Sequence, residues 1–363
     1  MADTAIKSEE EKKEYFDSPE ELDEKVSMLA EMVVMSQHMV AFTGAGISTA
    51  SGIPDYRSGY NTVLETGPGC WETAANKQKY LREVKAGNKG AQRPAEVKTL
   101  KNTIRSAYPS KTHMAFVELA ERKHLKYIIS QNVDGLHRKS GIAPDMMSEL
   151  HGNTNLEVCV KCGREHMRDH RVRNAQRTKD HLTGRKCDTP SCNGDLKDTI
   201  INFGENLNPN IMELGFHNSR IGDLHLVMGT SLRVQPAASM PLETVNNKGN
   251  LVICNLQKTP IDQYATLVIH AKCDDIMELL MKKLGYQIPT WQMKKRLNVA
   301  LSKDKKQIEV MGVDSNGAPY SLYEKVQVSF PTPNSIPKDI KATKMPYKMV
   351  LPDKVPEKFD IQL

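Results

Sequence analysis

The stretch Met39-Val40-Ala41-Phe42-Thr43-Gly44-Ala45-Gly46 indicates the fold class of this chain. Its apolar run is typical of a strand that is buried on both faces of a parallel sheet, and its glycines indicate a tight turn after that strand. In doubly wound folds, the N–H groups after such a turn meet the phosphates of a dinucleotide. By itself the turn is weak evidence, because an ordinary strand-to-helix connection has the same glycines. Thr49 stands where the dehydrogenase fingerprint has its third glycine, which counts against hydride transfer.

Other short apolar runs predict the remaining strands of this sheet. They lie at residues 127–129, 200–203, 224–228, 251–254 and 267–269. Helical patterns between several of them, at 112–123 and 274–284, complete the alternation of strands and helices. A capping box formed by Ser18 and Glu21, with Pro19 between them, predicts a helix before the first strand. We therefore predict an α/β fold with a doubly wound, Rossmann-like parallel sheet.

The chain divides into this sheet, two insertions and a C-terminal extension. The Rossmann-like domain is predicted to comprise residues 14–57, 112–155 and 198–290. Residues 58–111, rich in polar residues and glycine, are predicted to form a loop and insertion that is mobile without a ligand. Residues 156–197 carry paired cysteines and are predicted to form a small metal-binding module.

The C-terminal extension, 291–363, has a different pattern. Apolar residues alternate on both sides of Asn316-Gly317, which predicts a β-hairpin. The last 33 residues contain six prolines and few aromatic residues, and therefore predict an extended tail, disordered or laid along the surface.

Composition restricts the classes of protein to which the chain can belong. Apolar residues make up 39% of it, enough for a core, and no run reaches the ~18 apolar residues of a membrane span. We therefore expect no membrane contact and a cytosolic or nuclear location. The segment from Cys159 to Cys187 has nine Lys or Arg and three Asp or Glu. This basic surface is either simply solvated or contacts nucleic acid or an acidic protein.

Four of the seven cysteines have the spacing of metal ligands. Cys159-x2-Cys162 and Cys187-x4-Cys192, 24 residues apart, can place four thiolates tetrahedrally around Zn2+. Four protein ligands leave no open coordination position, so the predicted site is structural and not catalytic. The alternatives are two unrelated cysteine pairs or redox-active dithiols.

The string from Gly44 to Arg57, GAGISTASGIPDYR, resembles the signature of the sirtuin family. The resemblance extends from about Glu14 to about residue 290, and residues 14–22, with Thr49 and Tyr56, are most similar to the branch of sirtuins six and seven. Further stretches match in the expected order: Gln131-Asn132-Val133-Asp134-Gly135-Leu136-His137, Glu149-Leu150-His151-Gly152-Asn153, Phe203-Gly204-Glu205, Gly229-Thr230-Ser231-Leu232 and Asn255-Leu256-Gln257.

The resemblance implies an NAD-dependent protein lysine deacylase, in the first place a deacetylase, with a structural Zn2+. Its products would be nicotinamide and O-acyl-ADP-ribose, and its substrate an acyl-lysine protein or peptide such as a histone tail. His151 would be the general base, because an imidazole can take and return a proton near neutral pH. Asn132 and Asp134 would complete the catalytic set, although the place of Asp134 after a strand also fits a helix cap.

The resemblance also implies binding residues. The substrate peptide would meet Phe203, Gly204 and Glu205, although this loop is one residue longer than in the family. Trp71 would be the aromatic residue of the cofactor-binding loop, with nine additional residues between Arg57 and the segment Gly67-Pro68-Gly69-Cys70-Trp71. The implied cofactor-binding set is Gly44, Ala45, Gly46, Thr49, Asp55, Tyr56, Arg57, Trp71, Gln131, Asn132, Asp134, Gly229, Thr230, Ser231, Asn255, Leu256, Gln257 and Cys273.

Two alternative functions remain open from the sequence. A mono-ADP-ribosyltransferase would use the same bound NAD with another amino acid as the attacking group. A chromatin-associated NAD sensor or scaffold with little turnover is suggested by the basic module and by the clusters 294–296 and 303–306. The intact set of Asn132, Asp134 and His151 counts against the scaffold. Similarity to this branch and the basic clusters favour a nuclear location.

Overall fold

The computed structural model describes residues 9–86, 88, 107–168, 170–173, 179–292, 296–304, 306–313, 325–329, 340–344, 346–351 and 360–362. These residues form two compact units. The first comprises the described residues of 1–154, 176–181 and 199–291, and the second those of 155–175, 182–198 and 292–363. No helix among the described residues has both the length and the apolar character needed to cross a membrane.

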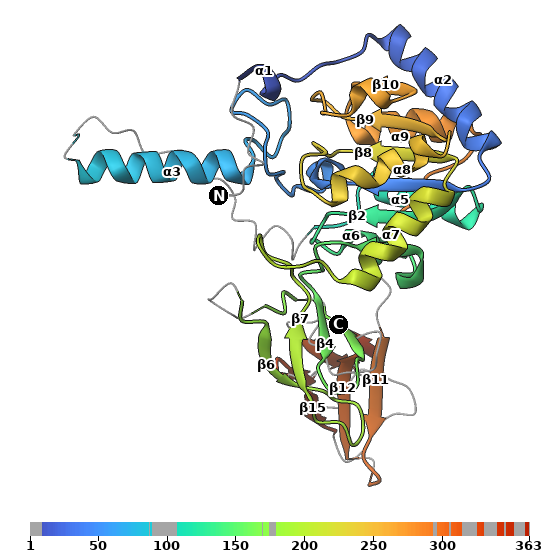
Figure 1. The fold of residues 1–363 in the computed structure, drawn as a ribbon. Helices are drawn as coiled ribbons and strands as arrows, with labels where there is room; N and C mark the ends of the chain where they lie inside the picture. Colours follow the sequence, from blue (N-terminus) through green and yellow to red (C-terminus); the bar gives the residue numbers. More distant parts are fainter. Residues whose placement is uncertain are drawn as a thin grey trace. The chain divides into compact units, whose positions relative to one another are not determined.

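The first unit is organised around a six-stranded parallel sheet (Figure 1). Its strands follow the order β10-β9-β8-β1-β2-β3. The chain runs outward from β1 to β2 and β3 on one side, and later from β8 to β9 and β10 on the other. The strands are β1 (Met39–Thr43), β2 (Leu125–Ser130), β3 (Met147–Glu149), β8 (Leu224–Met228), β9 (Asn250–Cys254) and β10 (Leu267–Ile269).

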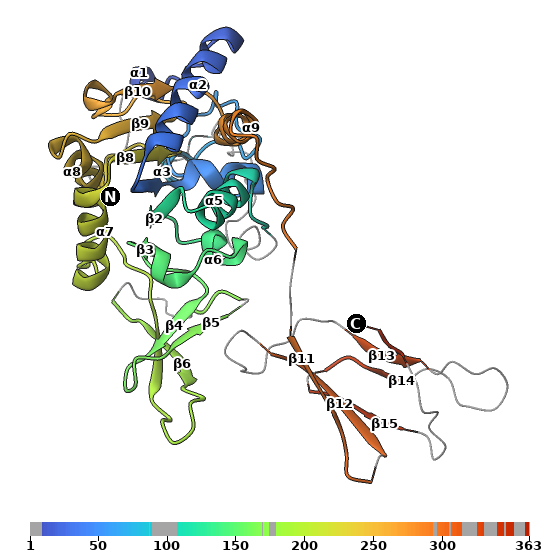
Figure 2. The ribbon, with the colours of Figure 1, turned by 90° about the vertical axis from the view of Figure 1, so that its right-hand side faces the viewer.

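Helices cover both faces of this sheet, which explains why every residue of β1 and β8 is buried (Figure 2). On one face α2 (Pro19–Met35), α5 (Lys111–Glu121) and α9 (Cys273–Lys283) pack against alternate strand residues such as Ala41 and Ile128. On the other face α7 (Pro209–Ile221) and α8 (Met240–Asn246) pack near the intervening residues, among them Phe42 and Ile129. Neighbouring residues of a strand point to opposite faces, so one apolar run supplies two cores.

Further helices lie in the connections of the first unit. They are α1 (Glu9–Lys12), α3 (Cys70–Lys85) and α6 (Leu136–Ser140), with 3-10 turns at Ala45–Ser51, Pro144–Met146, Ala237–Ser239 and Asp262–Tyr264. The sequence did not predict α3, none of whose residues is buried. The turn after β1 continues into the 3-10 helix at Ala45–Ser51.

Most of the predicted elements of the sheet are confirmed. Ser18 and Glu21 form the capping box, each side chain accepting a hydrogen bond from the other's backbone N–H. The strand predicted at 200–203 is wrong, because these residues form a loop after β7. Its apolar side chains line a cavity instead of a sheet core, and Phe203 is 59% exposed.

The cysteine-rich part of the second unit is a four-stranded antiparallel sheet in the order β5-β4-β7-β6. Its strands are β4 (Leu156–Cys159), β5 (Glu165–Met167), β6 (Leu182–Lys186) and β7 (Asp195–Asp198). Cys159 ends β4, and Cys187 directly follows β6. The sheet therefore brings the two cysteine pairs to the same end of the module.

The described C-terminal residues form two three-stranded antiparallel sheets with a common core that includes Ile308, Val328 and Tyr347. The predicted hairpin between the strands on either side of Asn316-Gly317 is wrong. The strand before it, β12 (Gln307–Val313), pairs with β11 (Arg296–Leu301) and β15 (Tyr347–Val350). The strand after it, β13 (Val326–Ser329), pairs with β14 (Ile340–Ala342) and β16 (Asp360–Gln362). Asn316-Gly317 itself lies outside the described residues. The strands are β11 (Arg296–Leu301), β12 (Gln307–Val313), β13 (Val326–Ser329), β14 (Ile340–Ala342), β15 (Tyr347–Val350) and β16 (Asp360–Gln362).

The predicted tail is extended in β14, β15 and β16, but the prediction that it is disordered or laid along the surface is wrong there, because these strands belong to sheets with a buried core. Alternation of apolar residues predicts which face of a strand is buried, but it does not specify the partner strand. Tyr347 and Met349 alternate with exposed residues and fill the core. The prolines of this segment therefore coexist with short strands.

Candidate functional site

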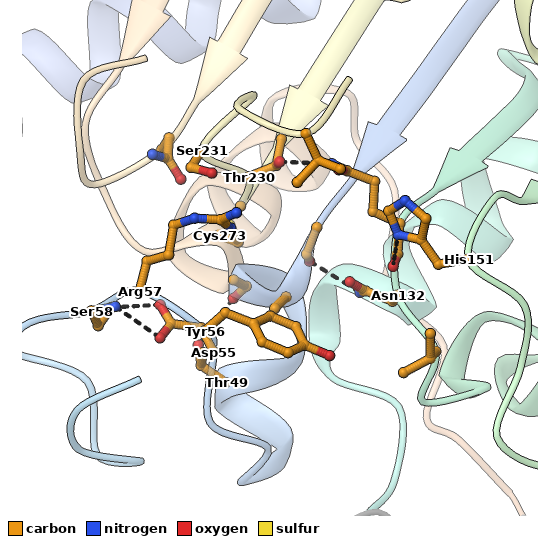
Figure 3. A pocket seen from close by; sticks show the side chains of 18 of the residues that line it. Thr49, Asp55, Tyr56, Arg57, Ser58, Asn132, His151, Thr230, Ser231 and Cys273 are labelled. Carbon is orange, nitrogen blue, oxygen red and sulfur yellow. Dashed lines mark hydrogen bonds between the residues drawn. The ribbon is translucent and has the colours of Figure 1, made fainter. Parts of the chain in front are cut away.

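A cavity of about 1140 Å3 lies in the first unit, at the carboxyl ends of the strands (Figure 3). Segments that directly follow β1, β2, β8 and β9 line it: residues 44–46, 131–133, 229–231 and 255–257. Strands β2 and β3 lie on one side of β1 in the sheet, and strands β8, β9 and β10 lie on the other. Loops therefore diverge at this point, and a crevice opens where doubly wound folds bind their ligands.

Close packing explains the glycines of the turn after β1. A Cβ atom on Gly44 would lie 2.6 Å from the carbonyl oxygen of Gly229, and one on Gly46 would lie 2.6 Å from the Cα of Gly229. Gly229 has a φ of +62°, a conformation that other L-residues rarely adopt. The backbone N–H of Gly46 donates to the Gly229 oxygen over 2.8 Å. The two turns therefore form one rigid floor of the cavity.

The loop after this turn carries a half-buried carboxylate, Asp55, and a half-buried cation, Arg57. Both oxygens of Asp55 accept hydrogen bonds from Ser58, one from its N–H (3.0 Å) and one from its hydroxyl (2.5 Å). Burial raises the pKa of Asp55, and the bonds from Ser58 oppose that rise. Burial, with the neighbouring charge of Arg233, lowers the pKa of Arg57 to about 10. Arg57 is therefore still a cation at neutral pH.

Trp71 lies beside Arg57 although thirteen residues separate them in the sequence. The N–H of Trp71 donates to the Tyr56 oxygen (3.1 Å), and the N–H of Gly69 donates to the Ser58 oxygen (2.8 Å). Residues 59–68 thus form a loop whose two ends are joined by these hydrogen bonds. The Arg57 guanidinium lies 4.4 Å from the centre of the Trp71 ring, within the range of a cation–π contact. The rings of Tyr56 and Phe203 lie 5.6 and 5.7 Å from that of Trp71.

His151 enters the cavity from the end of β3, on a different side from Arg57 (Figure 3). Its Nδ1 lies 3.0 Å from the backbone oxygen of Gln131. A carbonyl oxygen only accepts, so Nδ1 carries the hydrogen and Nε2 keeps its lone pair. Burial lowers the pKa of His151, while the bond to Gln131 opposes that change. The ring is therefore neutral near pH 7 and ready to accept a proton at Nε2.

Amide side chains connect the loops around His151. Gln131 Nε2 donates to the Thr230 hydroxyl (2.8 Å), which joins the loop after β2 to the turn after β8. Asn132 Nδ2 donates to the Gly44 oxygen (3.0 Å), which joins the same loop to the turn after β1. Each amide keeps its carbonyl oxygen available, since both bonds use the nitrogen. The cavity thus has fixed polar groups on the side of His151.

The loop at 200–205 forms another wall of the cavity. The N–H of Ile201 donates to the His151 oxygen over 3.0 Å, which sets the loop against the histidine. Glu205 accepts two hydrogen bonds from Asn202 and pairs with His181 at 3.2 Å. Ile200, Ile201 and Phe203 give this wall an apolar surface beside the polar floor.

The second unit contains the predicted metal ligands. The sulfur atoms of Cys159, Cys162, Cys187 and Cys192 all lie within 4.8 Å of one another. The N–H groups of Lys161 and Cys162 each lie 3.4 Å from the Cys159 sulfur. Hydrogen bonding led by the Cys162 N–H lowers the pKa of Cys159 to about 6, which favours the thiolate. Four sulfurs in this arrangement fit a tetrahedral Zn2+.

His166, which the sequence analysis did not single out, contacts one of the four cysteines, Cys187. Its Nε2 lies 3.5 Å from the Cys187 sulfur, and its Nδ1 lies 3.2 Å from a carboxylate oxygen of Asp188. His166 is completely buried. Groups that bond to a metal ligand in this way orient the ligand.

A model of the family described as Sir2 family matches residues 44–236. The chain belongs to the Sir2 family. The sirtuin named NAD-dependent protein deacetylase Sirt6 from Drosophila melanogaster is 36% identical over 287 residues, which cover 77% of this chain and 81% of that protein. Rice (Oryza sativa subsp. indica) SRT1 is 38% identical over 88% of this chain, and human sirtuin-7 is 38% identical over 77% of it; both are named NAD-dependent protein deacetylases. This chain therefore spans only part of these two relatives: 61% of the length of the rice protein and 64% of the length of the human protein.

Solved sirtuin structures agree with this fold. A structure titled as Sir2 bound to acetylated peptide is 29% identical, covers 72% of this chain and 100% of its own, and has a TM-score of 0.51. One titled Sir2-p53 peptide-NAD+ is 29% identical, covers 72% of this chain and 99% of its own, and has a TM-score of 0.50.

Within this sirtuin, the cavity brings together nearly all of the residues that the sequence suggested for the site. The exception is Asp134, which does not line the cavity. One of its oxygens accepts from the Ser48 hydroxyl (2.7 Å) and the other from the Leu136 N–H (2.9 Å), at the start of α6. The residue at the N-cap of α6 is Gly135, so Asp134 bonds to the first residue of the helix without being its cap.

Sequence analysis missed several residues of the cavity wall. Ile200 and Ile201 were assigned to a strand, and Glu14 was assigned no role. Val133 and Met212 also line the cavity. Val133 stands inside a matched stretch, so its neighbours could have indicated it. No local pattern marks Glu14 or Met212, because each reaches the cavity only through the folding of distant segments.

Proposed function

We propose that the protein is an NAD-dependent protein lysine deacetylase that forms nicotinamide and O-acetyl-ADP-ribose. The observation that carries this proposal is His151, a neutral imidazole whose Nδ1 is bonded to Gln131 and whose Nε2 is free to act as a base in the cavity. The deacetylases among the relatives, and the Sir2 structures with acetylated peptide or NAD+, support it.

The proposed NAD site extends across the turns at the carboxyl ends of the strands. Arg57 would face the phosphates, since it is a half-buried cation in a cavity whose floor is formed by backbone turns. Thr49, Asp55, Tyr56 and Trp71 would surround it on the loop side. The adenine and the ribose attached to it would lie toward the residues after β9 and at the start of α9: Asn255, Leu256, Gln257 and Cys273.

The proposed chemistry requires a base close to the ribose that carries nicotinamide. NAD, as co-substrate, would supply the ribose carbon that the acetyl oxygen attacks when nicotinamide leaves. His151 would then take a proton from a ribose hydroxyl at Nε2, while the Gln131 oxygen stabilises the imidazolium through Nδ1–H. Asn132 and Gln131, fixed by Gly44 and Thr230, would orient the ribose and the carboxamide.

The proposed peptide site is the apolar wall at 200–205. An acetyl-lysine side chain is a long aliphatic stem with a polar end, so it suits a channel that begins at exposed Phe203 and ends near His151. Gly204 and Glu205 would contact the backbone of the peptide. We further propose a nuclear location and histone tails as substrates. The basic residues of the cysteine-rich module support this proposal.

The test is a reaction of the purified full chain with NAD and acetyl-lysine peptides, beside succinyl and long-chain acyl peptides. We expect nicotinamide and O-acetyl-ADP-ribose in equal amounts, detected by mass spectrometry, and loss of both products in His151→Ala. The variant His217→Ala, on the exposed surface of α7, serves as a control. Transfer of radiolabelled ADP-ribose to protein without loss of acetyl groups would instead establish an ADP-ribosyltransferase. Bound NAD without turnover would establish a sensor or scaffold.

A further inference from the structure

The N-terminal segment 11–17, here called the strap, is bonded to the edge of the cavity. The N–H of Tyr15 donates to the Leu256 oxygen, and the N–H of Asp17 donates to the His270 oxygen, each over 2.8 Å. Gln257 Nε2 donates to the Lys12 oxygen over 3.1 Å. These bonds hold the strap against the ends of β9 and β10, independently of its side chains.

From this position the strap makes ion pairs with segments on two sides of the cavity. Lys12 Nζ lies 3.1 Å from the carboxylate of Glu72, next to Trp71. Glu11 lies 3.0 Å from Arg233, which follows the turn after β8. The strap therefore connects the end of the sheet with the loop that carries Arg57 and Trp71.

Glu14 is the residue of the strap that binds this loop most directly. One of its carboxylate oxygens accepts from the Thr62 hydroxyl over 2.6 Å, and the other accepts from the Val63 N–H over 3.0 Å. The Thr62 hydroxyl also lies 3.2 Å from the Leu64 N–H, and the Thr62 N–H lies 3.3 Å from the Gly59 oxygen. Glu14 thus fixes a turn that begins two residues after Arg57.

Glu14 and Leu64 both line the cavity, so this contact is part of its wall. The turn belongs to the residues that separate Arg57 from Gly69, where the chain returns to Tyr56 and Ser58. A segment that leaves and returns in this way has conformational freedom, which a bond at its middle removes. A carboxylate that accepts two hydrogen bonds is suited to this task because such bonds are stronger than those between neutral groups.

We infer that Glu14 is a positioning residue for NAD binding: its carboxylate holds the turn at 59–64 in the conformation that keeps Arg57 and Trp71 at the cavity. This inference rests on the proposed function, since NAD is its ligand. Glu14 acts through the loop and takes no part in the acyl transfer. Its loss therefore weakens the binding of the co-substrate more than that of the peptide, because Glu14 bonds to Thr62 and Val63 and reaches the wall at 200–205 through the ring contact of Trp71 with Phe203.

The test compares Glu14→Ala and Glu14→Gln with the wild type, and uses Glu20→Gln in the exposed first turn of α2 as a matched control. We expect Glu14→Ala to raise the KM for NAD about 10-fold, as fits the loss of charge-assisted hydrogen bonds. The KM for the acetyl peptide should rise much less than the KM for NAD, and the melting temperature should stay at the wild-type value. The KM for NAD of Glu14→Gln should lie between those of the wild type and Glu14→Ala, because the single carbonyl oxygen of glutamine can replace only one of the two carboxylate oxygens.

Hydrogen exchange provides a readout that does not depend on catalysis. The Val63 amide should exchange faster in Glu14→Ala and at the wild-type rate in Glu20→Gln. ADP-ribose binding, measured by calorimetry, should weaken in parallel with the KM for NAD. If the chain were no deacetylase, these two measurements would still report on Glu14. Wild-type exchange at Val63 together with wild-type ADP-ribose affinity would overturn the inference, and so would equal losses for NAD and peptide with a lower melting temperature.

Discussion

Buried histidines should make the stability of the first unit sensitive to acid. His225 lies in β8, and its Nδ1 donates to the Thr244 hydroxyl over 2.9 Å, because that hydroxyl donates its own hydrogen to the Ser219 oxygen. His137 donates from Nε2 to the Thr43 hydroxyl over 2.9 Å, since Thr43 donates to Ser130. Burial lowers the pKa of each of these two rings to about 3. Both are therefore neutral in the folded protein.

The direction of the pH effect follows from proton binding by the two states. Below about pH 6.5 the unfolded chain protonates these histidines while the folded protein does not, so stability falls as the pH falls. The loss begins near the ordinary pKa and continues down to the folded value. From about pH 7.5 to about pH 5, each histidine should lower the free energy of unfolding by about 2 kcal/mol. His113, whose pKa burial and His137 lower well below its usual value, acts in the same direction.

The variant His225→Asn isolates one of these contributions. An asparagine amide can still donate to Thr244, but it has no proton to gain, so the loss between about pH 7.5 and about pH 5 should shrink by about 2 kcal/mol. Urea denaturation at a series of pH values measures this difference in slope. Because the comparison uses the change of the free energy of unfolding with pH, it does not depend on the absolute stability of the variant. His217→Asn, on the exposed surface of α7, is the control. Equal slopes for the wild type and His225→Asn would refute the reasoning.

The remaining predictions concern the two sites. His151→Ala should lower deacetylation by ~10²- to 10⁴-fold with NAD affinity kept, while nicotinamide exchange survives better; near wild-type turnover would exclude this base. In the wild type, the acidic limb of the pH–rate profile should lie below about pH 6.5, because burial lowers the pKa of His151 and the neutral ring is the active form. Cys159→Ser with Cys162→Ser should remove one equivalent of Zn2+ and unfold the module, as metal analysis and circular dichroism would show. NAD should slow proteolysis within 58–79, and unchanged cleavage at saturating NAD would contradict the predicted loop.

The sequence predicted the sheet well because burial on both faces leaves a direct trace in the residues. Strands β1, β2, β8, β9 and β10 contain the predicted apolar runs, and the first four end where the cavity begins. Strand β3, with the sequence Met147-Ser148-Glu149, is not an apolar run and was not predicted. The run at 200–203 has the same composition but lines the cavity wall. A continuous apolar run indicates that its side chains are removed from water, but the wall of an open cavity buries them only in part, as the exposure of Phe203 shows. Composition alone could not separate the two cases.

Elements without a buried face were not predictable from periodicity. Helix α3 buries none of its residues, so no apolar stripe marks it. The position of Trp71 was uncertain for a related reason, since it depends on the backbone bonds from Gly69 and Trp71 to Ser58 and Tyr56. Glu14 is the same kind of case: its partners are Thr62 and Val63, about fifty residues away, and only the fold brings them together.

Asp134 shows how a motif residue can serve a site that it does not enter. Its carboxylate accepts from the Ser48 hydroxyl, and Asn132 Nδ2 lies 3.4 Å from that hydroxyl and 3.0 Å from the Gly44 oxygen. Burial raises the pKa of Asp134, and the bonds from Leu136 and Ser48 oppose the rise. The carboxylate therefore orients Ser48 beneath the turn after β1, and Ser48 supports the amide of Asn132 at the cavity. An Asn at this position would keep one acceptor oxygen and lose the other, so the bond from the Leu136 N–H and the bond from the Ser48 hydroxyl could not both persist.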